Sequence, residues 1–155
     1  MMLVNPYLNF NGNTEEVFNF YKSVFGGEFA AIMRYKDLPA GENLEDGCAE
    51  GVKNEDGDKI MHIALNIGST ILMGTDVPAN MEAVKFGTNL SLCISTDNRA
   101  AADEFFAGLS KDGTVEMPMQ DTFWGDYYGM LTDKYATQWM ISFNAAFQGK
   151  NEPSK

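Results

Sequence analysis

The feature that most constrains the fold of this chain is an internal repeat. The stretch NPYLNFNGNTEEVFNFYKSVFGGEF, residues 5–29, matches SLCISTDNRAAADEFFAGLSKDGTV, residues 91–115, when it is moved along by about 85 positions. Asn13 then falls on Asn98, and Val24 falls on Leu109. Because each copy reads as a strand, a helix and a turn into another strand, the chain is predicted to form two similar modules.

Both copies have the apolar spacing of an amphipathic helix. Apolar residues recur at i, i+3, i+4 and i+7: Val17, Phe20, Tyr21 and Val24 in the first copy, and Ala102, Phe105, Phe106 and Leu109 in the second. Asn13 or Thr14 is expected to cap the first helix and Asp97 or Asn98 the second, because their side-chain oxygens can accept hydrogen bonds from free backbone N–H groups. The Gly pair at 26–27 is expected to end the first helix.

The segments after each helix have the pattern of strands. GEFAAIMRY and KIMHIALNIGSTILMGTD follow the first helix, and TVEMPMQDTF and YYGMLTDKYATQWMISFN follow the second. The NIGST stretch between two apolar runs is typical of a hairpin turn. The predicted fold class is therefore α+β, with two βαβββ modules at about residues 5–80 and 88–145.

The two modules are predicted to belong to a single domain, residues 1–155, because no Pro- or Ser-rich linker divides a chain with 45% hydrophobic residues. Residues 36–58 are acidic and rich in Gly with no apolar period, so they are expected to form a loop that could act as a lid. Residues 146–155 are expected to form a C-terminal tail.

The charge of the chain excludes some partners. A formal net charge of −11 disfavours nucleic acid and anionic membrane surfaces, since both attract Lys and Arg. The sequence shows no membrane-spanning apolar stretch and no signal-peptide pattern. Cys48 and Cys93 lie in different contexts and are interpreted as reduced thiols, so a cytoplasmic location is expected.

Three segments together resemble a known family: PYLNFNGNTEEVFNFYKSVFGGEF, KIMHIALNIG and MPMQDTFWGDYYGMLTDKYATQW, in this order. They are similar to the PhnB-like branch of the vicinal oxygen chelate superfamily, which includes glyoxalases, bleomycin-resistance proteins and extradiol dioxygenases. The resemblance covers roughly residues 5–144. It implies a curved mixed sheet with a concave cavity, helices on the outside, and a homodimer.

Alternation along the strands predicts which side chains face that cavity. In the strand at 90–95, Leu90, Leu92 and Ile94 are expected to pack on the helices. In the strand at 61–67, Ile63, Leu65 and Ile67 are expected to do so. In the strand at 137–143, the residues expected to pack on the helices are Trp139, Ile141 and Phe143. The predicted ligand-binding residues are His62, Ser91, Cys93, Trp124, Gln138 and Met140. Met117 and Met119 could add to a soft wall, although core packing is the commoner use of Met.

The predicted ligand-binding roles of His62 and Trp124 each have an alternative interpretation. His62 is the only His, and a lone His on a strand is more often a hydrogen-bonded structural residue than a catalyst. Trp124 precedes a Gly at a turn, and pocket wall and plain packing are equally compatible with it. Trp139, between apolar alternates, is predicted to be core. Asp121, Asp126 and Asp133 lie near turns, where Asp chiefly stabilises the turn itself.

The resemblance also implies where metal-dependent relatives place His or Glu ligands. These positions fall on Pro6, Met73, Ser91 and Met140, and Ala136 stands where relatives usually carry Gly. Because Pro, Met and Ser do not supply the charge that a hard divalent cation needs, no metal and no cofactor are predicted.

The preferred hypothesis is a homodimer that binds an unidentified small organic molecule without the usual catalytic metal site. The alternatives are an atypical, metal-independent enzyme that uses His62 as acid or base, and a structural relict. A Rossmann-type methyltransferase is disfavoured, because the chain lacks a Gly-rich turn between strand and helix. A nucleophile triad is disfavoured because there is no GxSxG motif and no second His.

Overall fold

The computed structural model describes residues 2–38 and 54–147, which form two compact units, Met1–Lys85 and Phe86–Lys155. Unit 1 contains β1 (Tyr7–Phe10), α1 (Thr14–Phe25), β2 (Phe29–Arg34), η1 (Tyr35–Asp37), η2 (Asn54–Asp56), β3 (Ile60–Ile67) and β4 (Thr70–Asp76). Its four strands form one mixed sheet in the order β1-β4-β3-β2, in which only β1 and β4 are parallel.

Unit 2 repeats this arrangement. It contains β5 (Leu92–Ser95), α2 (Arg99–Ser110), β6 (Thr114–Asp121), β7 (Tyr127–Thr132), β8 (Gln138–Phe143) and η3 (Ala145–Phe147). The strand order is β5-β8-β7-β6, again with a single parallel pair, β5 and β8. The predicted α+β class with two βαβββ modules is therefore confirmed. Most of the acidic segment 36–58 and of the tail 146–155 lies outside the described residues.

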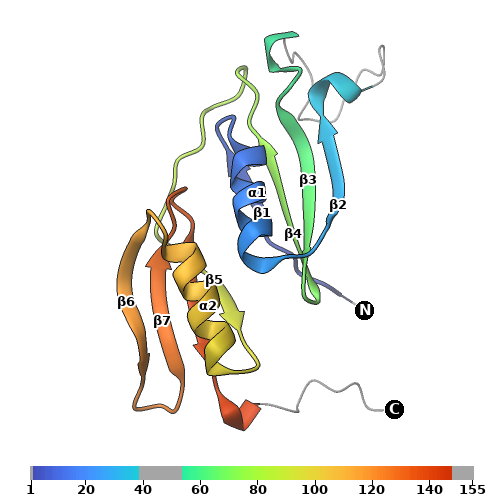
Figure 1. Ribbon diagram of the computed structural model, residues 1–155. Helices are drawn as coiled ribbons and strands as arrows, with labels where there is room; N and C mark the ends of the chain where they lie inside the picture. The colour runs from blue at the N-terminus through green and yellow to red at the C-terminus, as the bar shows by residue number, and fades with distance from the viewer. Residues whose placement is uncertain (1, 39–53, 148–155) are drawn as a thin grey trace, which may run out of the picture. The chain divides into compact units, whose positions relative to one another are not determined.

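One helix covers one face of each sheet (Figure 1). In unit 1, Val17, Phe18 and Tyr21 of α1 are fully buried, as are Ile63 and Leu65 of β3. In unit 2, Ala102 and Leu109 of α2 are buried with Leu131, Trp139 and Ile141 of the sheet. Apolar residues at helical spacing thus meet apolar residues at strand spacing, and this contact forms the core of each unit.

Leu90 departs from the predicted core. The strand begins only at Leu92, and Leu90 is 68% exposed because it precedes the ladder that β5 forms with β8. The expectation that Leu90 packs on a helix is wrong, whereas Leu92 and Ile94 are half-buried.

The two helices are capped in different ways. The side chain of Asn98 accepts a hydrogen bond from the backbone N–H of Ala101, so the predicted cap of α2 is confirmed. Asn13 occupies the N-cap position of α1, as predicted, but its side chain makes no capping hydrogen bond, so the expected side-chain cap is wrong. The missing acceptor is supplied by Asp76, at the end of β4.

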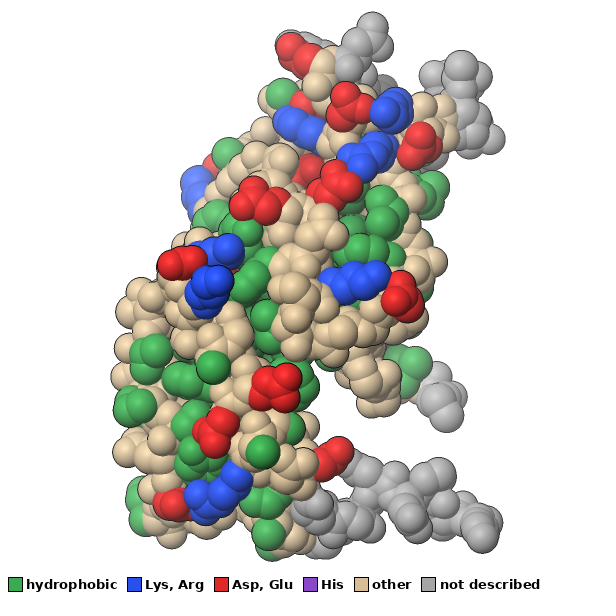
Figure 2. Space-filling view, viewed as in Figure 1, with side chains coloured by type: hydrophobic (Ala, Val, Ile, Leu, Met, Phe, Trp, Pro, Cys, Tyr) green, Lys and Arg blue, Asp and Glu red, His purple; other side chains and the backbone are tan. Residues whose placement is uncertain are grey.

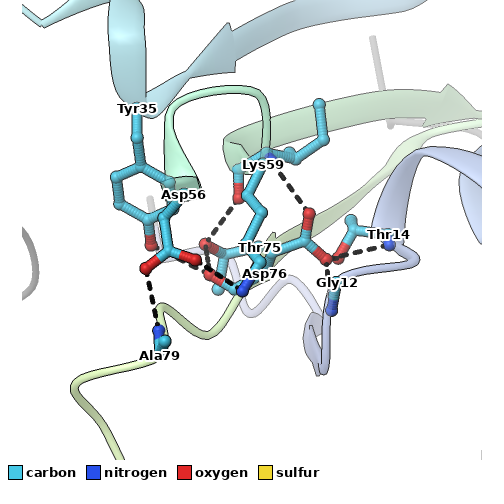
Figure 3. A network of polar contacts seen from close by, with 9 residues as sticks. Gly12, Thr14, Tyr35, Asp56, Lys59, Thr75, Asp76 and Ala79 are labelled. Carbon is cyan, nitrogen blue, oxygen red and sulfur yellow. Dashed lines mark hydrogen bonds and ion pairs between the residues drawn. The ribbon is translucent and has the colours of Figure 1, made fainter. Parts of the chain in front are cut away.

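The Asp76 carboxylate is the centre of a buried polar network (Figure 3). Oδ1 accepts hydrogen bonds from the backbone N–H groups of Gly12 and Thr14, both at 3.0 Å, and from the Thr14 hydroxyl at 2.6 Å. Oδ2 accepts from the backbone N–H of Ile60 at 2.8 Å. A strand end, a helix start and the start of β3 are therefore joined by one side chain.

Acidic and basic side chains alternate over the end of unit 1 that carries η1 and η2 (Figure 2). Lys59 pairs with the buried Asp56 at 2.6 Å, and Lys36 pairs with the exposed Asp58 at the same distance. None of the helices in the described ranges is long and apolar enough to cross a membrane.

Candidate functional site

Each sheet has a second face, opposite its helix, which we call the helix-free face. In unit 2 the buried residues Leu131, Trp139 and Ile141 alternate with the residues of this face. The helix-free face of unit 2 comprises Cys93, Ser95, Tyr128, Met130, Thr132, Gln138, Met140 and Ser142. The prediction that Trp139 is a core residue is confirmed, because its side chain is 3% exposed.

Four of the predicted ligand-binding residues lie close together at one edge of unit 2. Cys93 of β5 is the register partner of Met140 of β8, and residues paired in this way present their side chains on one face. Ser91 precedes β5, and its hydroxyl donates a hydrogen bond of 3.3 Å to Oε1 of Gln138. Cys93 is a free, exposed thiol; Cys48 lies outside the described residues.

Trp124 lies in the turn between β6 and β7 and is 51% exposed. Its ring is held in place nevertheless. Nε1 donates a hydrogen bond of 3.0 Å to Oδ2 of Asp126, and the indole contacts the ring of Tyr128 edge-on, with centroids 5.9 Å apart. Asp126 is itself fixed by a hydrogen bond from the side chain of Asn144. An exposed aromatic side chain is thus anchored beside the helix-free face.

Tyr128 was not identified from the sequence. It lies on β7 opposite Ser142, and burial raises the pKa of its hydroxyl, with a further increase from the nearby thiolate of Cys93. Tyr128 therefore contacts Trp124 at the turn and lies on the same face of the sheet as Cys93. The sequence signal was its alternation with Gly129 and Leu131, which places it on the same face as Met130.

His62 belongs to unit 1, on the helix-free face of that sheet. It alternates along β3 with the fully buried residues Ile63 and Leu65, which face α1. A hydrogen bond of 3.2 Å joins Nδ1 of His62 to the hydroxyl of Tyr7, and the two rings stack with centroids 5.8 Å apart. Tyr7 is on β1 and His62 on β3, so the Tyr7 side chain reaches across β4. Sequence reasoning did not anticipate this pair.

Asp133 and Asp121, two of the three Asp residues near turns, have partners of different kinds. Oδ1 of Asp133 accepts from the backbone N–H groups of Tyr135 and Thr137, and its Oδ2 accepts from Nε1 of Trp139. Asp121 pairs with Arg99, whose guanidinium holds the pKa of the Asp121 carboxyl below its ordinary value. The predicted role of Asp133 in a turn is confirmed.

The four positions that the resemblance predicts to correspond to metal ligands carry Pro, Met and Ser, which do not supply the charge that a hard divalent ion needs. Pro6 accepts a hydrogen bond from the backbone of Met73 through its carbonyl, and Tyr7 is the register partner of Met73. In unit 2 the corresponding residues are Ser91 and Met140. Within residues 2–38 and 54–147, no three His, Cys, Asp or Glu side chains converge into a group that could hold a metal.

This chain belongs to the Glyoxalase/Bleomycin resistance protein/Dioxygenase superfamily, whose family model matches residues 4–141. The match extends from before β1 into β8, the last strand of unit 2, and it agrees with the paired folds described above.

Individual relatives cover nearly the whole chain. The crystal structure of protein PA1353 from Pseudomonas aeruginosa is 31% identical, with a TM-score of 0.78, and the match covers 93% of this chain and 98% of that one. A putative 3-demethylubiquinone-9 3-methyltransferase, PhnB protein, from Bacillus cereus is 26% identical, with a TM-score of 0.70 and coverage of 92% and 99%. Protein YjdN of Escherichia coli strain K12 is 27% identical over 91% of this chain and 95% of its own. The resemblance to PhnB-like proteins is confirmed.

Proposed function

We propose that this protein binds a small organic molecule on the helix-free face of unit 2, without the divalent metal of metal-dependent superfamily members. Ser91, Cys93, Trp124, Gln138 and Met140 would contact the ligand. The net charge of −11 favours a neutral or cationic ligand over an anionic one. Superfamily membership supports small-molecule binding, and the Pro, Met and Ser residues at the metal positions support a metal-free mode.

The observation that carries the proposal is the fixed orientation of the exposed Trp124 ring. Leaving half of an indole in water is unfavourable, whereas covering it with a ligand releases that water. Its hydrogen bond to Asp126 and its edge contact with Tyr128 also mean that little side-chain freedom is lost on binding. The polar pair Ser91 and Gln138 supplies the few directional groups that a small-molecule site needs.

Native mass spectrometry of freshly purified protein tests the proposal. We expect a mass adduct of one small molecule per chain in the wild type and a loss of at least about tenfold in its occupancy in Trp124→Ala, since hot-spot aromatics contribute 2 kcal/mol or more. Phe86→Ala is the matched control, because Phe86 is also 51% exposed but lies outside the helix-free face. Equal adducts in both variants would contradict the proposed site.

The second candidate function is a metal-independent enzyme with His62 as acid or base. It is favoured by the hydrogen bond between the Tyr7 hydroxyl and Nδ1 of His62, because this bond holds the imidazole ring in one orientation, and an oriented His side chain is a common acid or base. The methyltransferase named for the Bacillus cereus protein would need a methyl donor site, and the chain has no Gly-rich turn for one. Incubating the released ligand with wild type and His62→Gln would reveal chemical turnover.

The assembly and location are proposed along with the function. We propose that residues 1–155 form a single domain, that two copies form a homodimer, and that the protein acts in the cytoplasm without nucleic-acid or membrane partners. Light scattering across a concentration series would test the dimer: a mass of about twice 17.1 kDa is expected, and a monomer at all concentrations would refute it.

A further inference from the structure

The helix-free face of unit 2 carries one sulfur-containing residue on every strand, and these residues are in register. Cys93 of β5 pairs with Met140 of β8, Met140 pairs with Met130 of β7, and Met130 pairs with Met117 of β6. We call these four residues the sulfur row. Cys93 is exposed, and the three Met residues are half-buried.

The residues on either side of the sulfur row are polar. On one side lie Ser95, Ser142 and Tyr128, which are also register partners across the same three strands. On the other side lie Gln138 and Thr132. Methionine that only fills a core is surrounded by apolar residues, as Met119 is, whose Sδ lies beside Phe106 of α2 near Gly129. The sulfur row is instead a narrow band within a hydroxyl-rich face.

The spacing of the row permits convergence on one ion. Adjacent strands lie about 4.8 Å apart and paired side chains on one face about 4.5–5.5 Å apart. Met has three rotatable side-chain bonds, so the thioethers of Met130 and Met140 can turn toward the thiol of Cys93.

We propose that Cys93, Met140 and Met130 form a binding site for a soft monovalent cation, of which Cu(I) is the representative. Thiolate and thioether donors select Cu(I) over hard divalent ions, and the thiolate neutralises the single charge of the ion. Binding transfers the thiol proton to solvent and forms metal–sulfur bonds, with no change of oxidation state. The sulfur donors that make this face unsuitable for the hard metals of related proteins therefore suit a soft one. The site goes beyond the organic ligand proposed above and does not depend on it.

Anaerobic competition with the chromophoric chelator bicinchoninate tests the site in the full-length protein, with Cu(I) as the probe. The wild type is expected to remove one equivalent of Cu(I) per chain from the chelator. Cys93→Ser is expected to abolish this, and Met130→Leu and Met140→Leu to weaken it at least about tenfold, since even changes to residues that only hydrogen-bond to metal ligands cost about 10–100-fold. Leu matches the volume of Met, so these variants remove sulfur with little change in packing.

Met81→Leu is the matched control, because Met81 is 48% exposed and belongs to unit 1, whereas the sulfur row belongs to unit 2. It is expected to bind Cu(I) as the wild type does. X-ray absorption of the copper-loaded wild type gives a second readout that needs no variant: the expected coordination shell contains sulfur only. No competition by the wild type, unchanged affinity in Cys93→Ser, or a shell of nitrogen or oxygen ligands would each overturn the proposal.

Discussion

Asp76 caps a helix that begins at Thr14, 62 residues earlier in the chain. Both the backbone N–H and the hydroxyl of Thr14 donate to the same carboxylate oxygen, at 3.0 and 2.6 Å. Because Asp76 is the last residue of β4, the contact fixes the start of α1 against the end of the strand that lies beside β1. A single buried acid thus joins helix and sheet in unit 1.

Replacing Asp76 should therefore destabilise the protein strongly. Asp76→Ala leaves the N–H groups of Gly12, Thr14 and Ile60 without their acceptor. Those of Thr14 and Ile60 are buried, and each orphaned buried donor costs about 1–3 kcal/mol. We expect a loss of about 3 kcal/mol or more in the free energy of unfolding, measured in urea. Glu104→Ala, on the exposed side of α2, is the control and should stay within about 0.5 kcal/mol of wild type.

The two residues in the N-cap position should behave differently, although both are Asn. Asn98→Ala removes a hydrogen bond to the backbone of Ala101 and should cost about 1 kcal/mol. Asn13→Ala removes no such bond and should cost less than about 0.5 kcal/mol. Equal losses in urea denaturation would show that the side chain of Asn13, and not that of Asp76, caps α1.

Ala136 is expected to be a site of backbone strain. Its φ is 67°, in the left-handed region, which costs a residue with a Cβ about 1–2 kcal/mol. Ala136→Gly relieves this strain. It also lowers the free energy of unfolding by about 0.5–1 kcal/mol, because Gly gives the unfolded chain more conformational entropy. We expect a net stabilisation of about 0.5–1 kcal/mol. A lower melting temperature in Ala136→Gly would argue against the left-handed turn between β7 and β8.

The raised pKa of Tyr128 predicts a loss of stability at high pH. Burial, and then the Cys93 thiolate, hold the folded-state pKa above the unfolded value of 10.0. The folded state therefore keeps this proton more tightly, so the contribution is fully present below pH 10.0 and is lost as pH rises through the folded-state pKa. In Tyr128→Phe, the fall of the free energy of unfolding with pH in this alkaline range should be shallower.

Cys93→Ser provides a second check on the same residue. Removing the thiolate should lower the pKa of Tyr128 part of the way toward its ordinary value, because burial remains as the larger cause. Tyrosinate absorbance, recorded as a difference between Cys93→Ser and the double variant with Tyr128→Phe, measures this pKa. An unchanged pKa would mean that Cys93 and Tyr128 do not interact.

The fold was predictable because it depends on local periodicity. Val17 and Tyr21 recur at helical spacing and Trp139 and Ile141 at strand spacing, and all four are buried as expected. The Asp76 cap was not predictable in this way, because the acceptor lies far from α1 in the sequence. Asn13, directly before the helix, is the residue type that usually caps the first turn, and it was therefore chosen instead. The prediction that Leu90 packs on a helix was wrong for a related reason. The apolar alternation includes Leu90, but the hydrogen-bonded ladder of β5 with β8 begins only at Leu92.

For the candidate site, the sequence predicted only which face of each strand a side chain occupies. Alternation placed Cys93 and Met140 on one face, and their register pairing agrees with that. The contacts of Tyr7 with His62 and of Tyr128 with Trp124 depend on which strands are neighbours and on how far a ring reaches across them. Neither strand order nor register follows from the spacing of residues within a strand.

The most direct test of the central claim is whether the organic ligand stays bound after metal is removed. Native mass spectrometry would be recorded before and after dialysis against EDTA, with elemental analysis of Zn, Ni and Mn in the same samples. We predict the same ligand adduct in both samples and no stoichiometric amount of these metals. Loss of the adduct on chelation and its return with about one of these ions per chain would contradict the account.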